Sequence, residues 1–281
     1  MNESSGDGEF PEVTATGGAQ RHVLYPVVES ESDATGRVAA SVAAALDATL
    51  FVGPVDTTAT GTTVEDRHAA AERAFRTDAG SPVDVTARGV VLSGATPLAA
   101  VASAVRDHGV DAVVLESDAA DRLEPRLARR VDSDVVVVNG HGGVESIASL
   151  LVPVSRGPHA GGAVGVAGAI ARANDAWLEL VHFHDGSDPG RADEILAGGA
   201  ATAPDDVPVD TRPVEADDPV EGIVEESNYH DATVVGAPRK GRLKRLVFGS
   251  TTAEVRDRAP NTVVTVKRNG EGDSLLPGRI E

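Results

Sequence analysis

The sequence predicts an α/β protein made of two tandem, doubly wound, five-stranded parallel-sheet domains. Apolar runs rich in β-branched residues alternate with helical stretches, which is typical of parallel strands covered by helices on both faces. This order of elements occurs twice. The halves also align segment by segment: HVLYPV (22–27) with SLLVPV (149–154), DAVVLE (111–116) with DATVVG (231–236), and DVVVVN (134–139) with TVVTVK (262–267).

Five strands separated by helices are expected in the first half. The expected strands are 22–28, 49–55, 83–91, 111–116 and 134–139, and the expected helices are 33–47, 64–77, 97–108 and 122–131. The third helix has a clear start, because Thr96 is a good N-cap residue and Pro97 suits the first helical position.

The second half repeats the order. The expected strands are 149–154, 176–183, 207–214, 231–236 and 262–267, and the expected helices are 160–174, 191–197, 219–227 and 251–258. Asp218, Pro219 and Glu221 give the third of these helices an N-cap, a first-turn proline and a capping-box carboxylate.

These elements divide the chain into a disordered N-terminal tail (1–20), a first domain (21–140), a Gly-rich linker (141–148), a second domain (149–268) and a C-terminal tail (269–281). The stretch NGHGG at 139–143 superficially resembles an esterase oxyanion loop. The chain contains no Gly-x-Ser-x-Gly nucleophile elbow, so this stretch is interpreted as the linker.

Composition excludes several classes of function. Without cysteine, disulfides, thiol catalysis and cysteine-based zinc sites are impossible. The N-terminus does not read as a secretory signal, and no apolar run reaches the roughly 20 residues that span a bilayer, so a cytoplasmic protein without membrane insertion is expected. The net charge of −19, with three lysines against 22 arginines, resembles the cytosol of a salt-in halophile and disfavours nucleic acid as a partner.

Positive charge is nevertheless concentrated in one basic segment, residues 239–245, which contains five arginines and lysines. Gly236 precedes it, and Gly249, Ser250 and Thr251 follow it at the start of an expected helix. The interval from Glu116 to Asp134 is 18 positions, whereas the matching interval from Gly236 to Thr262 is 26. The first half therefore lacks the segment and has Glu116 in place of Gly236.

Three roles are open for the basic segment. Ligands of doubly wound sheets bind beyond the carboxyl ends of the strands, and the start of a helix attracts anions, so the segment can be a phosphate cradle. It can also dock onto an acidic surface of its own chain or of a partner, or contact nucleic acid. It is not a P-loop, because Arg242 and Leu243 stand where lysine and Ser/Thr are required.

With Gly236, Arg239, Gly249 and Ser250, the second half resembles the universal stress protein family, whose signature is G-x2-G-x9-G-[ST] in a domain of strand order 3-2-1-4-5. The resemblance implies that adenosine lies against Pro153, Val154 and Ser155 and near Phe183. It implies that the phosphates lie on a cradle comprising Val235, Gly236, Arg239, Gly249, Ser250 and Thr251. Arg239 stands where the second glycine is expected, and either clamps phosphate or obstructs the loop.

The expected function is therefore binding of an adenine nucleotide, ATP or AMP, at the second domain for sensing or regulation in a stress response. Any Mg²⁺ would come with the nucleotide, and at most weak ATPase activity is expected. The alternative is an interaction module without nucleotide that regulates a partner, such as a membrane transporter in trans. His182 and His184 are interpreted as strand histidines rather than metal ligands.

The resemblance also bears on assembly, because terminal strands of the family commonly pair across a two-fold axis. Here the equivalents are 134–138 and 262–266. A pseudo-two-fold monomer or a homodimer, with these strands adjacent, is expected.

Overall fold

The computed structural model describes residues 20–28, 33–56, 85–127, 130–140, 146–186, 189–237 and 248–267. It confirms the predicted α/β class. No helix within these ranges is both long enough and apolar enough to cross a membrane. The predicted helix at 64–77 lies outside the described residues.

The first half follows the predicted order, with one change among its strands. The expected strand at 83–91 is replaced by two short strands, β3 and β4, after residues 81–84, which lie outside the described residues. The elements are β1 (Arg21–Val27), α1 (Asp33–Ala45), β2 (Ala48–Asp56), β3 (Ala87–Gly89), β4 (Leu92–Ser93), α3 (Pro97–Asp107), β5 (Ala112–Glu116), α4 (Ser117–Leu127) and β6 (Asp134–Asn139).

The second half repeats this order and adds a 3-10 turn, η1, after its third helix. The elements are β7 (Ser149–Pro153), α5 (Pro158–Asn174), β8 (Trp177–His184), α6 (Pro189–Ala200), β9 (Val209–Glu215), α7 (Pro219–Glu226), η1 (Ser227–Tyr229), β10 (Ala232–Gly236), α8 (Phe248–Arg258) and β11 (Thr262–Lys267).

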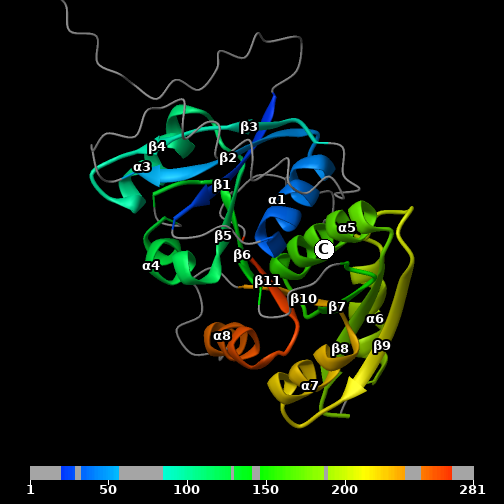
Figure 1. The fold of residues 1–281 in the computed structure, drawn as a ribbon. Helices are drawn as coiled ribbons and strands as arrows, with labels where there is room; N and C mark the ends of the chain where they lie inside the picture. Colours follow the sequence, from blue (N-terminus) through cyan, green and yellow to red (C-terminus); the bar gives the residue numbers. More distant parts are fainter. Residues whose placement is uncertain are drawn as a thin grey trace, which may run out of the picture.

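All these strands form a single sheet in the order β3-β2-β1-β5-β6-β11-β10-β7-β8-β9, with β4 paired to β2 off this path (Figure 1). Neighbouring strands within each half are parallel, while β6 and β11 are antiparallel, with Val138 opposite Val264. The strands expected to be adjacent are thus paired. The Asn139 side chain adds a link between the halves, since its Nδ2 donates to the Arg256 carbonyl at 2.8 Å.

The core is also shared between the halves. Helices α1, α5 and α6 pack on one face of the sheet, and one buried cluster joins Val42 of α1 and Ile170 of α5 to Val138 and Val264 of the central strands. In Figure 1, α1 and α5 lie side by side over the middle of the sheet. On the opposite face, α3 and α4 cover the first half and α7 and α8 the second, each pair with its own cluster.

Two local expectations were wrong. Helix α4 begins at Ser117 rather than 122, because no turn residues intervene after β5 and Asp118 favours the first turn of a helix. Glu221 does not close a capping box: its carboxylate accepts from Arg258 of α8 at 2.7 and 2.8 Å, although Asp218 caps α7 as predicted. Ile147, near the end of the expected linker, is buried in the core.

Candidate functional site

The predicted site residues that the structure describes lie along the carboxyl edge of the second half of the sheet. In the order β9-β8-β7-β10-β11 the direction of strand succession reverses between β7 and β10, which is where ligands bind in doubly wound sheets. Leu151 pairs with Thr233 there, so Pro153, which ends β7, and Gly236, which ends β10, lie at the same edge.

The three residues predicted at the end of β7 differ in accessibility. Val154 is buried, its N–H donates to the Val181 carbonyl at 2.8 Å, and its carbonyl accepts from His182 Nδ1 at 2.8 Å. Both backbone groups of Val154 are therefore already bonded within the protein. Pro153 is half-buried and Ser155 is exposed, so Ser155 offers the accessible polar side chain.

Gly236 is a glycine because helix α5 starts directly against it. A Cβ at this position would lie 2.5 Å from the carbonyl oxygen of His159, in the first turn of α5. The preceding Gly157 has φ 128°, a conformation that favours glycine, and it turns the chain into the helix. The sequence interpretation gave Gly236 the role of admitting an anion, and the structure shows that the missing side chain makes room for the backbone of α5.

Helix α8 begins at Phe248, so Gly249, Ser250 and Thr251 lie in its first turn. The first N–H groups of a helix have no intrahelical partner and carry the positive end of the helix dipole, which suits phosphate. Val235, which precedes Gly236, is buried within β10. Arg239 and the rest of the basic segment lie outside the described residues.

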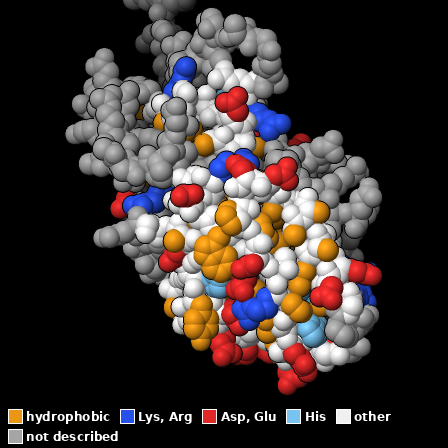
Figure 2. All heavy atoms as spheres, turned by 90° about the vertical axis from the view of Figure 1, so that its right-hand side faces the viewer, with side chains coloured by type: hydrophobic (Ala, Val, Ile, Leu, Met, Phe, Trp, Pro, Cys, Tyr) orange, Lys and Arg blue, Asp and Glu red, His pale blue; other side chains and the backbone are white. Residues whose placement is uncertain are grey.

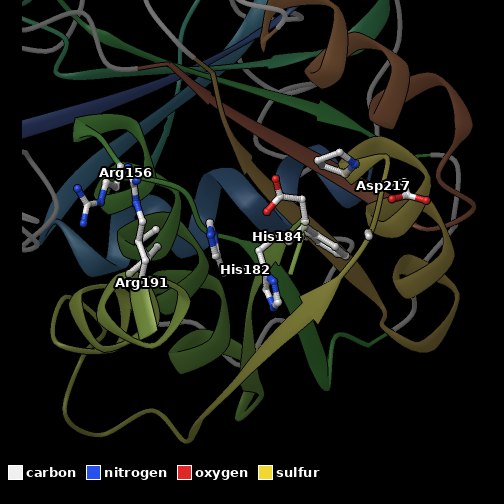
Figure 3. A pocket seen from close by; sticks show the side chains of 10 residues that line it. Arg156, His182, His184, Arg191 and Asp217 are labelled. Carbon is white, nitrogen blue, oxygen red and sulfur yellow. The ribbon is translucent and has the colours of Figure 1, made fainter. Parts of the chain in front are cut away.

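A cavity of about 420 Å³ opens at the same edge, beyond the ends of β8 and β9. It is lined by Arg156, His182, Phe183, His184, Asp185, Arg191, Ile195, Ala216, Asp217 and Pro219. Figure 3 shows the two arginines on one side, Asp217 on the other, and the two histidines between them. Its volume lies in the range of small-molecule sites, roughly 300–1,000 Å³.

Phe183 is the predicted residue that lines this cavity. It packs against α7, since a Cβ at Gly222 would lie 2.5 Å from its ring. The arginines were not predicted. Arg156 follows β7 by three residues, and Arg191 lies in the first turn of α6. Their position after strand ends at the carboxyl edge is the signal that would have identified them.

The two histidines present opposite hydrogen-bonding groups. A carbonyl oxygen only accepts, so His182 Nδ1 carries a proton toward Val154, and Nε2 of the neutral ring is an acceptor. His184 Nδ1 accepts from the Gly186 N–H at 3.0 Å, so Nε2 of its neutral ring is a donor. The rings are nearly parallel, with centroids 6.5 Å apart. Together they can bind a ligand that has both donors and acceptors.

The charges at the cavity are mixed. Arg156 contacts Glu194 at 3.5 Å, but both side chains are more than half exposed, so this ion pair holds the guanidinium weakly. Arg156 and Arg191 suit an anionic group of a ligand, while Asp185 and Asp217 suit polar hydrogens. This combination fits a small molecule with an anionic end and a neutral polar end.

The matching edge of the first half is built differently. Glu116 ends β5, pairs with Val138, and is followed at once by α4. Residues 237–247 separate β10 from α8 in the second half, and β5 and α4 have no such segment between them. Between β5 and α4 the first half therefore has no counterpart of residues 237–247.

Comparison with known proteins agrees with this asymmetry. The model of the universal stress protein family matches residues 146–267. Residues 146–267 therefore resemble a universal stress protein domain. The match leaves the first half outside it, and no curated protein sequence matches the chain.

The whole chain resembles solved universal stress protein structures in fold. One from Archaeoglobus fulgidus is 15% identical, covers 89% of this chain and 99% of its own, and has a TM-score of 0.58. The cytoplasmic domain of a prokaryotic cation chloride cotransporter is 11% identical, covers 91% and 98%, and has a TM-score of 0.57. A universal stress protein in complex with cAMP is 25% identical over 44% of this chain and 99% of its own, with a TM-score of 0.35.

Proposed function

We propose that the second half of this chain binds one adenine nucleotide, ATP or AMP, and that binding serves sensing or regulation rather than turnover. The observation that carries this proposal is the convergence of residues from four segments on one edge. The ends of β7, β8 and β10 lie at the carboxyl edge of the sheet, where the cavity opens, and the first turn of α8 follows the end of β10 in the chain.

The anionic end of the ligand is assigned to the first turn of α8 and the arginines. Gly249, Ser250 and Thr251 supply backbone N–H groups and hydroxyls at a helix start. Arg239 is proposed to approach the phosphates from the basic segment. Any Mg²⁺ would be held through the nucleotide, since phosphate oxygens are its preferred ligands.

The base and ribose are assigned to the part of the cavity away from Arg156 and Arg191. Phe183 supplies an aromatic surface, and His182 and His184 supply an acceptor and a donor, as the edge of adenine requires. Ser155, which is exposed two residues after the end of β7, is assigned to the nucleoside.

Isothermal calorimetry with ATP, AMP and cAMP tests the proposal. At most one nucleotide per chain is expected. Gly249→Val should abolish binding by blocking backbone approach, and Glu116→Gly should not create a second site, because the first half has no segment between β5 and α4. Two sites in the parent chain, or unchanged affinity in the Gly249→Val variant, would contradict it.

Two arginine variants distinguish binding in the cavity from long-range electrostatic attraction. Arg191→Gln should weaken ATP binding about 10-fold or more, since a charged hydrogen bond contributes about 1.5–3 kcal/mol. Arg126→Gln makes the same charge change at an exposed position of α4 in the first half, and should leave the affinity unchanged. Equal effects of the two variants would point to long-range attraction rather than to a site.

The second candidate is an interaction module that acts on a partner in trans, such as a membrane transporter. It is favoured by the fold likeness to the cytoplasmic domain of a cation chloride cotransporter, which shows that this architecture also occurs as part of a transporter. Failure of all three nucleotides to bind would favour this second candidate.

A further inference from the structure

One part of the second half leaves aromatic side chains in solvent. Trp177 begins β8 and is 38% exposed, and Tyr229 in η1 is 74% exposed; they are the large hydrophobic residues exposed within the described ranges. Figure 2 views the molecule from the β8–β9 side and shows hydrophobic side chains gathered there among acidic ones. We call Trp177, Glu179, Asp210 and Tyr229 the aromatic–acidic face.

The fold does not require an aromatic residue to be exposed here. Thr49 is the counterpart of Trp177 in the first half. The two residues pair with His22 and Ser149, which match each other in the alignment of 22–27 with 149–154. Thr49 is 2% exposed, so the matching position of the first half is buried. Helix α7 has eight residues where α3 has 11, and it covers Val181 but not the beginning of β8. Exposed tryptophan and tyrosine are typical of protein interfaces.

Contacts with His230 and Arg212 hold this face rigidly in place. The His230 side chain is 3% exposed; its Nδ1 lies 3.2 Å from the Glu226 carbonyl and its Nε2 lies 3.1 Å from Glu179. The Trp177 ring packs on His230 with centroids 5.7 Å apart. Arg212 bonds both Glu179 and Glu226, so its charge is satisfied within the protein. A rigid surface loses little entropy when a partner binds.

The charge of this face is unbalanced. Glu179 and Asp210 are direct neighbours on adjacent strands, so their side chains lie on the same side of the sheet. Like charges in this arrangement are destabilising. Arg212 neutralises part of the charge of Glu179 and Glu226, while the exposed Asp210 adds a third carboxylate. The arrangement is unfavourable by itself, and a cation from outside would relieve it.

We propose that the aromatic–acidic face docks a partner protein through an arginine- or lysine-bearing segment. A guanidinium can lie on the rings of Trp177 or Tyr229 while it bonds the Asp210 carboxylate, and a lysine ammonium can do so less specifically. The net charge of −19 repels a second copy of this chain and attracts a basic partner. The docking does not depend on the nucleotide site, which lies at the carboxyl edge of the sheet.

Trp177 is the single tryptophan of the chain, so intrinsic fluorescence reports directly on this face. The probe is an acetylated hexapeptide of alternating glycine and arginine, compared with its glutamine-for-arginine analogue. The arginine peptide should change the fluorescence saturably and bind more weakly as salt is added. Asp210→Asn and Tyr229→Ala should each weaken binding about two- to fivefold, the size of an exposed ion pair or cation–π contact.

Asp193→Asn is the matched control, because it makes the same charge change at an exposed position of α6, on the opposite face of the sheet. It should leave peptide binding unchanged. The proposal is overturned if the glutamine analogue binds equally well, if Asp210→Asn behaves like Asp193→Asn, or if the arginine peptide has no effect. It is also overturned if sedimentation shows self-association that Tyr229→Ala abolishes, since a second copy would then occupy the face.

Discussion

Replacing Gly236 with alanine should destabilise the protein even without any ligand. The added Cβ would lie 2.5 Å from the His159 carbonyl oxygen and 2.9 Å from its carbon, whereas ordinary contacts begin near 3.4 Å. Both contacts are with backbone, so one element must move by nearly 1 Å relative to the other. Overpacking of this kind costs about 1–3 kcal/mol. The melting temperature should therefore fall by roughly 2–4 °C for each kcal/mol lost.

The same chemical change at Gly36 should have the opposite sign. Gly36 lies within α1, and its added Cβ would meet Tyr25 Cε1 at 4.0 Å, which is an ordinary contact. Alanine is favoured over glycine inside a helix by about 0.5–1 kcal/mol. Gly36→Ala should raise the melting temperature by a few degrees, at roughly 2–4 °C per kcal/mol.

Thermal melts of both variants, followed by circular dichroism without nucleotide and again with ATP, give the comparison. Packing against α5 predicts that Gly236→Ala lowers the melting temperature in both conditions. If its melting temperature is unchanged without nucleotide but the stabilisation by ATP is lost, Gly236 is needed for the ligand and not for packing. That result would refute the steric explanation.

Two further predictions concern charge. With a net charge of −19, the melting temperature should rise as KCl is added, because salt screens repulsion among carboxylates; a flat or falling curve would refute the interpretation as adaptation to salt. Hydrogen bonds from Arg212 lower the pKa of Glu179 below its usual 4.5, so the folded state holds this proton less readily than the unfolded state. The stabilisation from this ionised carboxylate is present above pH 4.5 and is lost as the pH falls through the lowered pKa. Glu179→Gln should therefore be less stable than the parent at pH 7 and should lose stability less steeply in acid. Urea titrations at each pH would measure both differences.

Much of the fold follows from local patterns. The strands 134–139 and 262–267 are rich in valine, because central strands of the sheet are buried on both faces. Thr96 and Asp218 mark helix starts correctly, since capping depends on residues adjacent in sequence. The boundary of α4 was missed by five residues, because a strand that runs directly into a helix leaves no glycine or proline between them.

The sequence by itself determined the α/β class, the repeated order of elements and the residues grouped at the carboxyl edge, because periodicity, capping and strand ends are encoded locally. Only the tertiary structure decided what those residues do there. It showed that Gly236 admits the α5 backbone, that His182 and His184 have opposite hydrogen-bonding roles, and that Arg156 and Arg191 line one cavity. These facts depend on contacts between elements distant in sequence, and no local pattern specifies which atoms will meet.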